Sequence, residues 1–184
     1  LVSAYVHFEN CRFEGFDKSN STGAIDAYQS HPLIRYCSFS NNAGPAIASG
    51  ANAASSPQIY YSEFHHNNTS NANTPQINLG TSGSDTIRII GNTIQGLYNM
   101  AGGIALSALI GGPVRAIVDS NVISNNRYGI ACLGSDVRTW IRHNLITDNN
   151  IQNLPMQGGS GLNFMGGSGN VSYVSYNEIY GNLW

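Results

Sequence analysis

The stretch Ile141-Arg142-His143-Asn144-Leu145-Ile146-Thr147-Asp148-Asn149 decides the fold. In it, an apolar residue is followed three positions later by asparagine, and the same four-residue pattern then repeats. Residues equivalent to Ile146 occur in seven segments, at Phe13, Phe39, Phe64, Ile94, Ile123, Ile146 and Ile179. Successive equivalents are 23 to 33 residues apart. A period of this size is typical of a repeat protein whose units stack on one another.

Two further columns accompany this first column. Five residues earlier every unit has an apolar residue, at Phe8, Ile34, Ile59, Ile89, Val118, Ile141 and Val174. Asparagine predominates two residues before and three residues after the first column, at 92, 121, 144 and 177 and at 42, 67, 126, 149 and 182. Parallel strands stacked about 4.8 Å apart place equivalent residues above one another. Buried asparagines can then bond to the coils on either side, which predicts amide ladders.

A further short strand is predicted in six of the seven units. It is centred on Ile25, Ile47, Ile77, Ile104, Ile130 and Leu162. The insertions that change the repeat length fall just before this strand, notably at 68–76 and 150–161. The core columns therefore stay in register, and the differences in repeat length are confined to loops at one edge of the stack.

Composition agrees with stacked strands and excludes other classes. Only 10% of the 184 residues are charged, against about 25% in a typical domain, while 23 are asparagine, and the net charge is −2. Ten Tyr, six Phe and two Trp argue against disorder. No apolar run reaches the roughly 18 residues of a membrane span, and the near-neutral charge gives no footprint for nucleic acid.

With these motifs the chain resembles the right-handed parallel β-helix superfamily, the pectate-lyase-like fold. The resemblance implies an all-β, right-handed parallel β-helix. The seven repeats predict about seven rungs, and the sequence departs from the superfamily in showing neither of the end caps common there. We expect residues 1–184 to form a single domain that is a segment of a longer chain. Because open sheet edges invite aggregation, we expect further chain before Leu1 and after Trp184, or self-association, to cover both ends of the stack.

Strand alternation places most of the arginines on one outward face. Side chains that alternate with the buried column of Ile89 and Ile141 point outward. The candidate ligand-binding residues on that face are Arg35, Tyr60, Arg88, Arg138, Trp140 and Tyr173. Guanidinium groups pair with carboxylates and aromatic rings stack on sugar rings, so the face suits an acidic polysaccharide such as a uronan. Alternatively, the arginines only shield the strands and pair with Asp119 or Glu9.

The candidate catalytic residues are Asp119, Arg142 and Arg115. Asp119 has Arg142 one coil further in its own column, and uronan elimination needs a cation on the sugar carboxylate and groups that move protons. No two acids fall on adjacent coils of one outward column, which disfavours both a Ca²⁺ site and a pair of hydrolytic carboxylates. We therefore expect no metal and no cofactor.

Other residues carry weaker signals. His65 and His66 lead into the 68–76 loop without evident metal partners, and alternation points His143 inward as a buried imidazole. Cys11 and Cys37 share a column on adjacent coils, so they form either a disulfide or two stacked thiols. The outward side of the further strand is rich in Ala, Gly and Ser, which predicts a flat face that packs against other chain or binds a partner.

Together these observations predict an extracellular or cell-surface protein that binds, and in one version processes, an acidic polysaccharide along the arginine-bearing and aromatic face. The processing enzyme would be a polysaccharide lyase or another carbohydrate-active enzyme. The competing hypothesis is a non-catalytic structural or adhesin segment. Neither a nucleic-acid partner nor a membrane span is expected.

Overall fold

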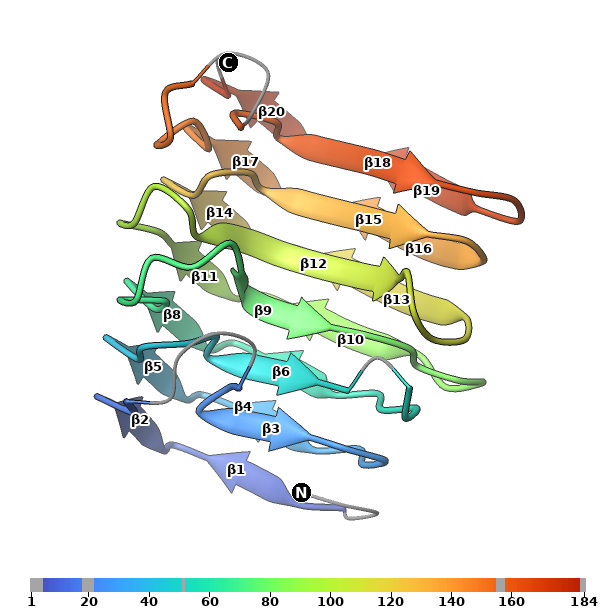
Figure 1. Ribbon diagram of the computed structural model, residues 1–184, viewed down its shortest axis with the longest axis horizontal. Coiled ribbons are helices and arrows are strands. Elements are labelled where there is room, and N and C mark those ends of the chain that lie inside the picture. Colours follow the sequence, from blue (N-terminus) through green and yellow to red (C-terminus); the bar gives the residue numbers. More distant parts are fainter. Residues whose placement is uncertain (1–4, 18–21, 51, 155–157, 183–184) are drawn as a thin grey trace.

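The chain forms a parallel β-solenoid, in which successive coils add strands to three sheets (Figure 1). This computed structural model describes residues 5–17, 22–50, 52–154 and 158–182, so Leu1, Trp184 and part of the predicted 150–161 loop lie outside the described residues. Within the described ranges every helix-or-strand element is a strand, and all sheet pairings are parallel. No helix suited to spanning a membrane is found in those same ranges.

Sheets 1 and 2 have seven strands each, and sheet 3 has six. Sheet 1 is formed by β1 (His7–Glu9), β4 (Leu33–Arg35), β7 (Gln58–Tyr60), β10 (Ile87–Ile90), β13 (Val114–Asp119), β16 (Val137–Arg142) and β19 (Val171–Ser175). Sheet 2 is formed by β2 (Arg12–Glu14), β5 (Ser38–Ser40), β8 (Glu63–His65), β11 (Thr93–Gln95), β14 (Val122–Ser124), β17 (Leu145–Thr147) and β20 (Glu178–Tyr180). Sheet 3 is formed by β3 (Ile25–Ala27), β6 (Ile47–Ser49), β9 (Pro75–Leu79), β12 (Gly102–Ala108), β15 (Ile130–Gly134) and β18 (Leu162–Gly166).

The predicted register is confirmed in all three sheets. Ile141 pairs with Val118 and Val174 in sheet 1, and Ile146 pairs with Ile123 and Ile179 in sheet 2. In sheet 3 the column centred on Ile130 joins Ile104 to Leu162. These columns converge on one buried core that runs the length of the stack. In its first coils the core includes a stack of phenyl rings, with 4.6 Å between the centroids of Phe13 and Phe39 and 4.9 Å between those of Phe39 and Phe64.

Sheets 1 and 2 are joined by a two-residue turn whose first residue adopts the left-handed conformation. Ser120, His143 and Tyr176 have φ of 56°, 53° and 55° in successive coils. The second turn residue is the ladder position, and Asn121 donates from its Nδ2 to Asn144 Oδ1 at 2.9 Å. Asn144 in turn donates to Asn177 Oδ1 at 2.9 Å. The predicted amide ladder is therefore confirmed at this turn.

The inward placement predicted for His143 is wrong. Alternation holds along an extended strand, but the left-handed φ of His143 turns its side chain out of the strand pattern. The imidazole is 51% exposed, bonds to Asp119 through Nδ1 at 3.1 Å, and stacks on Tyr176 with 5.4 Å between centroids.

The second ladder lies beyond sheet 2. One of its amides comes from outside the repeat position. Asn42 bonds to Asn67, and Asn126 bonds to Asn149, as the columns predict. Between these pairs the equivalent residue is Leu97, which is 51% exposed and outside the core. Gln76, which is fully buried, connects the two parts because its Oε1 accepts from Asn67 Nδ2 at 3.0 Å and its Nε2 donates to Asn126 Oδ1 at 2.9 Å.

Of the two alternatives for the cysteine column, the structure has thiols. Cys11 and Cys37 are both unbonded to another sulfur, and each donates weakly to a backbone carbonyl at 3.3 Å. Burial raises the pKa of Cys37, which keeps its thiol protonated at neutral pH. These residues therefore act as small members of the ladder column rather than as a cross-link.

Candidate functional site

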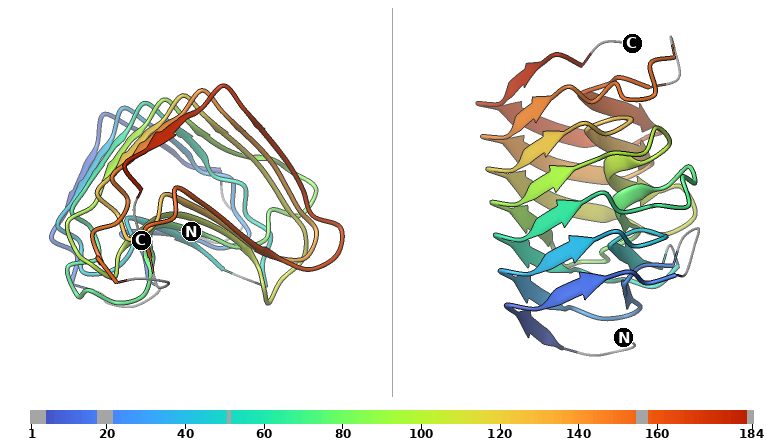
Figure 2. Two further views of the ribbon diagram at one scale, coloured as in Figure 1. Left: turned by 90° about the horizontal axis from the view of Figure 1, so that it is seen from above. Right: turned by 90° about the vertical axis from the view of Figure 1, so that its left-hand side faces the viewer.

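A concavity lies on the outer side of sheet 3. Two adjoining hollows, of about 620 Å³ and 440 Å³, share Asn78 and Ser107 among their lining residues. One hollow extends over β9, β12, β15 and β18, and the other over β3, β6, β9 and β12. Together they form a trough that follows the stacking direction, and seen along that direction the chain outline bends inward at sheet 3 (Figure 2).

The floor of the trough is the face predicted to be flat. Its central residues are Asn78, Ala105, Ala131 and Asn163, which pair in register from β9 to β18. The prediction of small side chains is confirmed for these central positions, but the prediction of a flat surface is wrong. Loops beside the strands rise above the floor, and the small side chains leave the space between them open.

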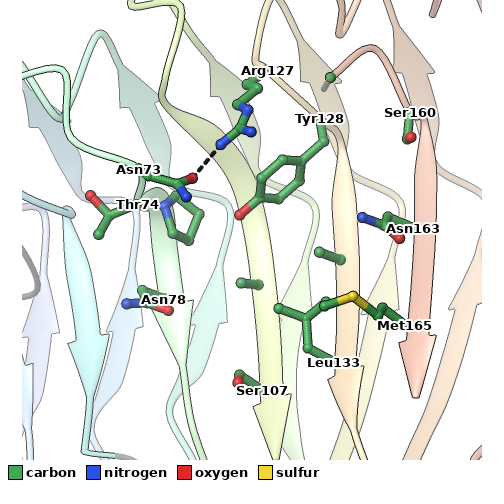
Figure 3. A pocket seen from close by; sticks show the side chains of 14 residues that line it. Asn73, Thr74, Asn78, Ser107, Arg127, Tyr128, Leu133, Ser160, Asn163 and Met165 are labelled. Atoms are coloured by element: carbon green, nitrogen blue, oxygen red, sulfur yellow. Dashed lines mark hydrogen bonds between the residues drawn. The ribbon is translucent and has the colours of Figure 1, made fainter. Parts of the chain in front are cut away.

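One wall of the trough is formed by the loops that precede the sheet 3 strands (Figure 3). Arg127 lies at its centre and donates from Nε to Gln152 Oε1 at 2.6 Å and from Nη1 to Asn73 Oδ1. Gln152 also reaches Met100 Sδ at 3.4 Å. A single guanidinium group therefore ties together loops from three coils, which fixes the height of the wall.

Tyr128 adds an aromatic surface to the same wall (Figure 3). Its ring lies against Gly102, where an added Cβ would come within 2.2 Å of Tyr128 Cζ, so only glycine fits beneath the ring. Burial raises the pKa of Tyr128 to about 12, although the positive charge of Arg127 acts in the opposite direction. The phenol therefore stays protonated at neutral pH and retains its hydrogen-bond donor.

The arginines of sheet 1 lie on its outer face as predicted, but three of the five are held in ion pairs. Arg35 Nη2 is 3.0 Å from Glu9 Oε2, and Arg138 Nε is 3.3 Å from Asp136 Oδ1. Further along the face, Trp140 and Tyr173 stack with 5.8 Å between ring centroids. The alternative that arginines pair with neighbouring acids is thus observed for these residues.

Asp119 and Arg142 are brought together, whereas Arg115 lies apart from them. Arg142 Nε donates to Asp119 Oδ2 at 2.7 Å, and Ser120 Oγ donates to Oδ1 at 2.9 Å. Burial alone would raise the pKa of Asp119, but hydrogen bonds from Arg142, His143 and Ser120 outweigh it and lower the pKa. A carboxylate held in its charged form by three donors is a weak proton acceptor. Arg115 stands four residues earlier on β13, and its Nε is buried without a hydrogen-bond partner in the described structure.

Two histidine arrangements have no catalytic geometry. His65 Nε2 lies 3.4 Å from Glu63 Oε2, and no group of three or more His, Cys, Asp or Glu among the described residues is arranged to hold a metal ion. His31, which sequence reasoning missed, contacts both Ser56 and Asp85, yet both contacts use Nδ1. A Ser-His-Asp relay needs the two different ring nitrogens, so this arrangement is not one.

Comparison with protein-family models, with curated proteins and with solved structures finds no match to this chain. Any functional conclusion therefore depends on the geometry of the sites. The trough was not predicted from the sequence, although the sequence contains both of the features that form it. The insertion at 68–76 directly precedes the strand around Ile77, and the outward residues that follow are small.

Proposed function

We propose that this protein is an extracellular or cell-surface β-solenoid of the pectate-lyase-like type that binds an extended polysaccharide in the sheet 3 trough. The observation that carries the proposal is the shape of the trough. It follows the stacking direction across all six strands of sheet 3 and is open along its length. A long, open channel suits a linear polymer better than a compact small molecule.

The lining supports a hydroxyl-rich ligand. Asn78 and Asn163 offer amide donors and acceptors, Ser107 and Ser160 offer hydroxyl groups, and Tyr128 offers a ring face for stacking. Asn78 and Asn163 lie at the two ends of the column Asn78, Ala105, Ala131 and Asn163, so a ligand that contacts both amides must extend along the stacking direction. The acidic preference predicted from the sequence depends on sheet 1 rather than on the trough.

Binding is better supported than cleavage. Asp26 is the one carboxylate among the described lining residues of the two hollows. Hydrolysis of a glycosidic bond ordinarily uses two carboxyl groups. The candidate elimination residues Asp119 and Arg142 lie on sheet 1, outside the trough.

The proposal is tested by a variant whose trough is filled by a large side chain. Ser107, which lines both hollows, is changed to Trp, and a glycan array followed by calorimetry measures affinity for the polysaccharides that bind the unchanged protein. We expect Ser107→Trp to weaken binding by about a hundredfold or more, because a bulky ring in the channel excludes the ligand. Ser124→Trp, at a half-buried strand position of sheet 2, is the matched control and should bind normally.

Two results would contradict the proposal. One is equal binding by Ser107→Trp and the unchanged protein, which would place the ligand elsewhere. The other is failure of the unchanged protein to bind any glycan, which would favour the structural or adhesin segment instead.

A further inference from the structure

A separate hollow lies on the outer face of sheet 1, away from the trough. Its volume is about 590 Å³, and it extends over β1, β4, β7 and β10 and the segment before β10. The residues that give it chemical character are Tyr5, His31, Gln58, Tyr60, Asp85 and Arg88. It shares no lining residue with the trough.

The hollow contains an arginine whose charge is not neutralised by a neighbour. Arg35, Arg138 and Arg142 each pair with a carboxylate, but Arg88 and Arg115 have no such partner among the described residues. These two arginines are neighbours, because Arg88 pairs with Ile117 and Arg115 precedes Ile117 by two residues on the same face. Two neighbouring arginines without a carboxylate partner favour an anion beside Arg88, and Asp85 in the same hollow offsets part of their charge.

Gln58 holds Arg88 in a defined position. Its Nε2 donates to the backbone oxygens of Ser56 and Thr86 at 3.1 and 2.7 Å, which fixes the amide. Its Oε1 then accepts from Arg88 Nη1 at 3.0 Å and from Tyr60 Oη at 3.2 Å. A guanidinium group has five N–H donors, and the described structure assigns one of them to Gln58. Arg88 is therefore preorganised while most of its donors remain available to a ligand.

The remaining lining residues favour a ring-shaped ligand. Tyr5 stacks on His31 with 5.0 Å between centroids, and this provides an apolar surface beside the charged group. Asp85, the one carboxylate among the described lining residues, has an oxygen 3.5 Å from His31 Nδ1 and forms no ion pair with Arg88 in the described structure. It therefore contributes an acceptor for hydroxyl groups at a different place from the arginine.

We propose that this hollow binds a sugar carboxylate, meaning one uronic-acid residue of an acidic glycan, with Arg88 donating to the carboxylate. A planar carboxylate accepts two parallel N–H bonds from a guanidinium group. The sugar ring would lie along Tyr5 and His31, with its hydroxyl groups toward Asp85. This site is separate from the trough and gives the molecule a second, charge-selective contact on the opposite side of its core.

The experiment titrates ¹⁵N-labelled protein with trigalacturonate and follows the backbone amides of Gln58, Tyr60 and Arg88 by NMR. Fully methyl-esterified trigalacturonate is the matched ligand, because it has the same rings without the charges. We expect the acid to shift these amides and the ester to bind at least about tenfold more weakly. Acetate distinguishes a sugar site from a general carboxylate site and should bind much more weakly than the trimer.

Arg88→Gln should weaken trigalacturonate binding about tenfold or more. Arg12→Gln removes the same charge from sheet 2, where Arg12 pairs with Glu14, and should bind as the unchanged protein does. Absence of shifts at the three amides, equal binding of acid and ester, or normal binding by Arg88→Gln would each overturn the proposal. The ester comparison uses the unchanged protein, so it remains decisive if a variant does not fold.

A variant at one site should leave binding at the other site unchanged. Ser107→Trp should leave the trigalacturonate shifts at Gln58 and Tyr60 intact, and Arg88→Gln should leave the binding of a neutral polysaccharide in the trough intact. Loss of both trigalacturonate binding and trough binding in either variant would show that the sites are not independent.

Discussion

The two edges of sheet 2 both contain buried amide side chains that join successive coils, but their connecting segments differ in length. At the edge toward sheet 1 the connection has two residues in every coil, as at Ser120 and Asn121. At the edge toward sheet 3 its length varies, from five residues at 125–129 to fourteen at 148–161. We call these the short-turn edge and the loop edge. Both contain an amide ladder, but only the loop edge carries the wall of the trough.

The difference shows what a ladder requires. At the short-turn edge the amides come from one repeat position, because a turn of constant length returns it to the same place in each coil. At the loop edge the amide of Gln76 replaces the missing asparagine at Leu97. What matters is a buried amide between coils, whatever its place in the sequence. This tolerance allows the loop edge to vary in length and to build a binding surface.

The largest effect is expected from breaking the short-turn edge. Asn121→Leu removes four hydrogen bonds, two accepted from Asn92 and two donated to Ile89 and Asn144. Leucine can replace none of these four buried bonds, and Asn92 N loses its side-chain acceptor, so we expect a loss of about 4 kcal/mol in the free energy of unfolding, measured in urea. Asn121→Ser should lose less, since Ser62 at the equivalent position still accepts from Cys37 N. A loss close to zero would show that the ladder does not hold the coils together.

A smaller effect is expected at the loop edge. Gln76→Leu removes the bonds to Asn67 and Asn126, but each asparagine keeps other partners in the ladder. We expect a loss of about 2 kcal/mol in the free energy of unfolding. Gln95→Leu, on the half-buried outer side of β11, is the control and should change stability little. A loss equal to that of Asn121→Leu would mean that the two edges are equally rigid.

The smallest effect concerns the charges beside the short-turn edge. Since the folded state lowers the pKa of Asp119, its carboxylate stabilises the fold above the ordinary aspartate pKa, and this contribution disappears as pH falls through the lowered value. Asp119→Asn should therefore reduce stability at pH 7 by about 1 kcal/mol or less. The difference between the two proteins should shrink below about pH 4. Urea melts across this range measure it, and a difference that grows on acidification would contradict the assignment.

Most of the fold follows from the sequence because it is periodic. Residues such as Ile141 and Ile146 recur at corresponding places, so the register of every sheet and the ladder at the short-turn edge could be predicted. The outward placement of Arg88 and Tyr60 followed from alternation in the same way. His143 could not be placed, because alternation stops where the backbone turns left-handed. The trough also escaped prediction, because its depth depends on where loops of unequal length come to rest.

The sequence by itself determined the stacked strands, since each repeat buries the same apolar columns and no single unit can bury them alone. Only the tertiary structure decided which arginines are paired, which amide replaces the one missing at Leu97, and that the small-residue face is concave. These features depend on contacts outside the repeat, such as Gln76 with Asn126 and Arg127 with Asn73, which lie 50 and 54 residues apart. A periodic pattern specifies how coils stack, but the contacts between their irregular loops form only after the stack has brought them together.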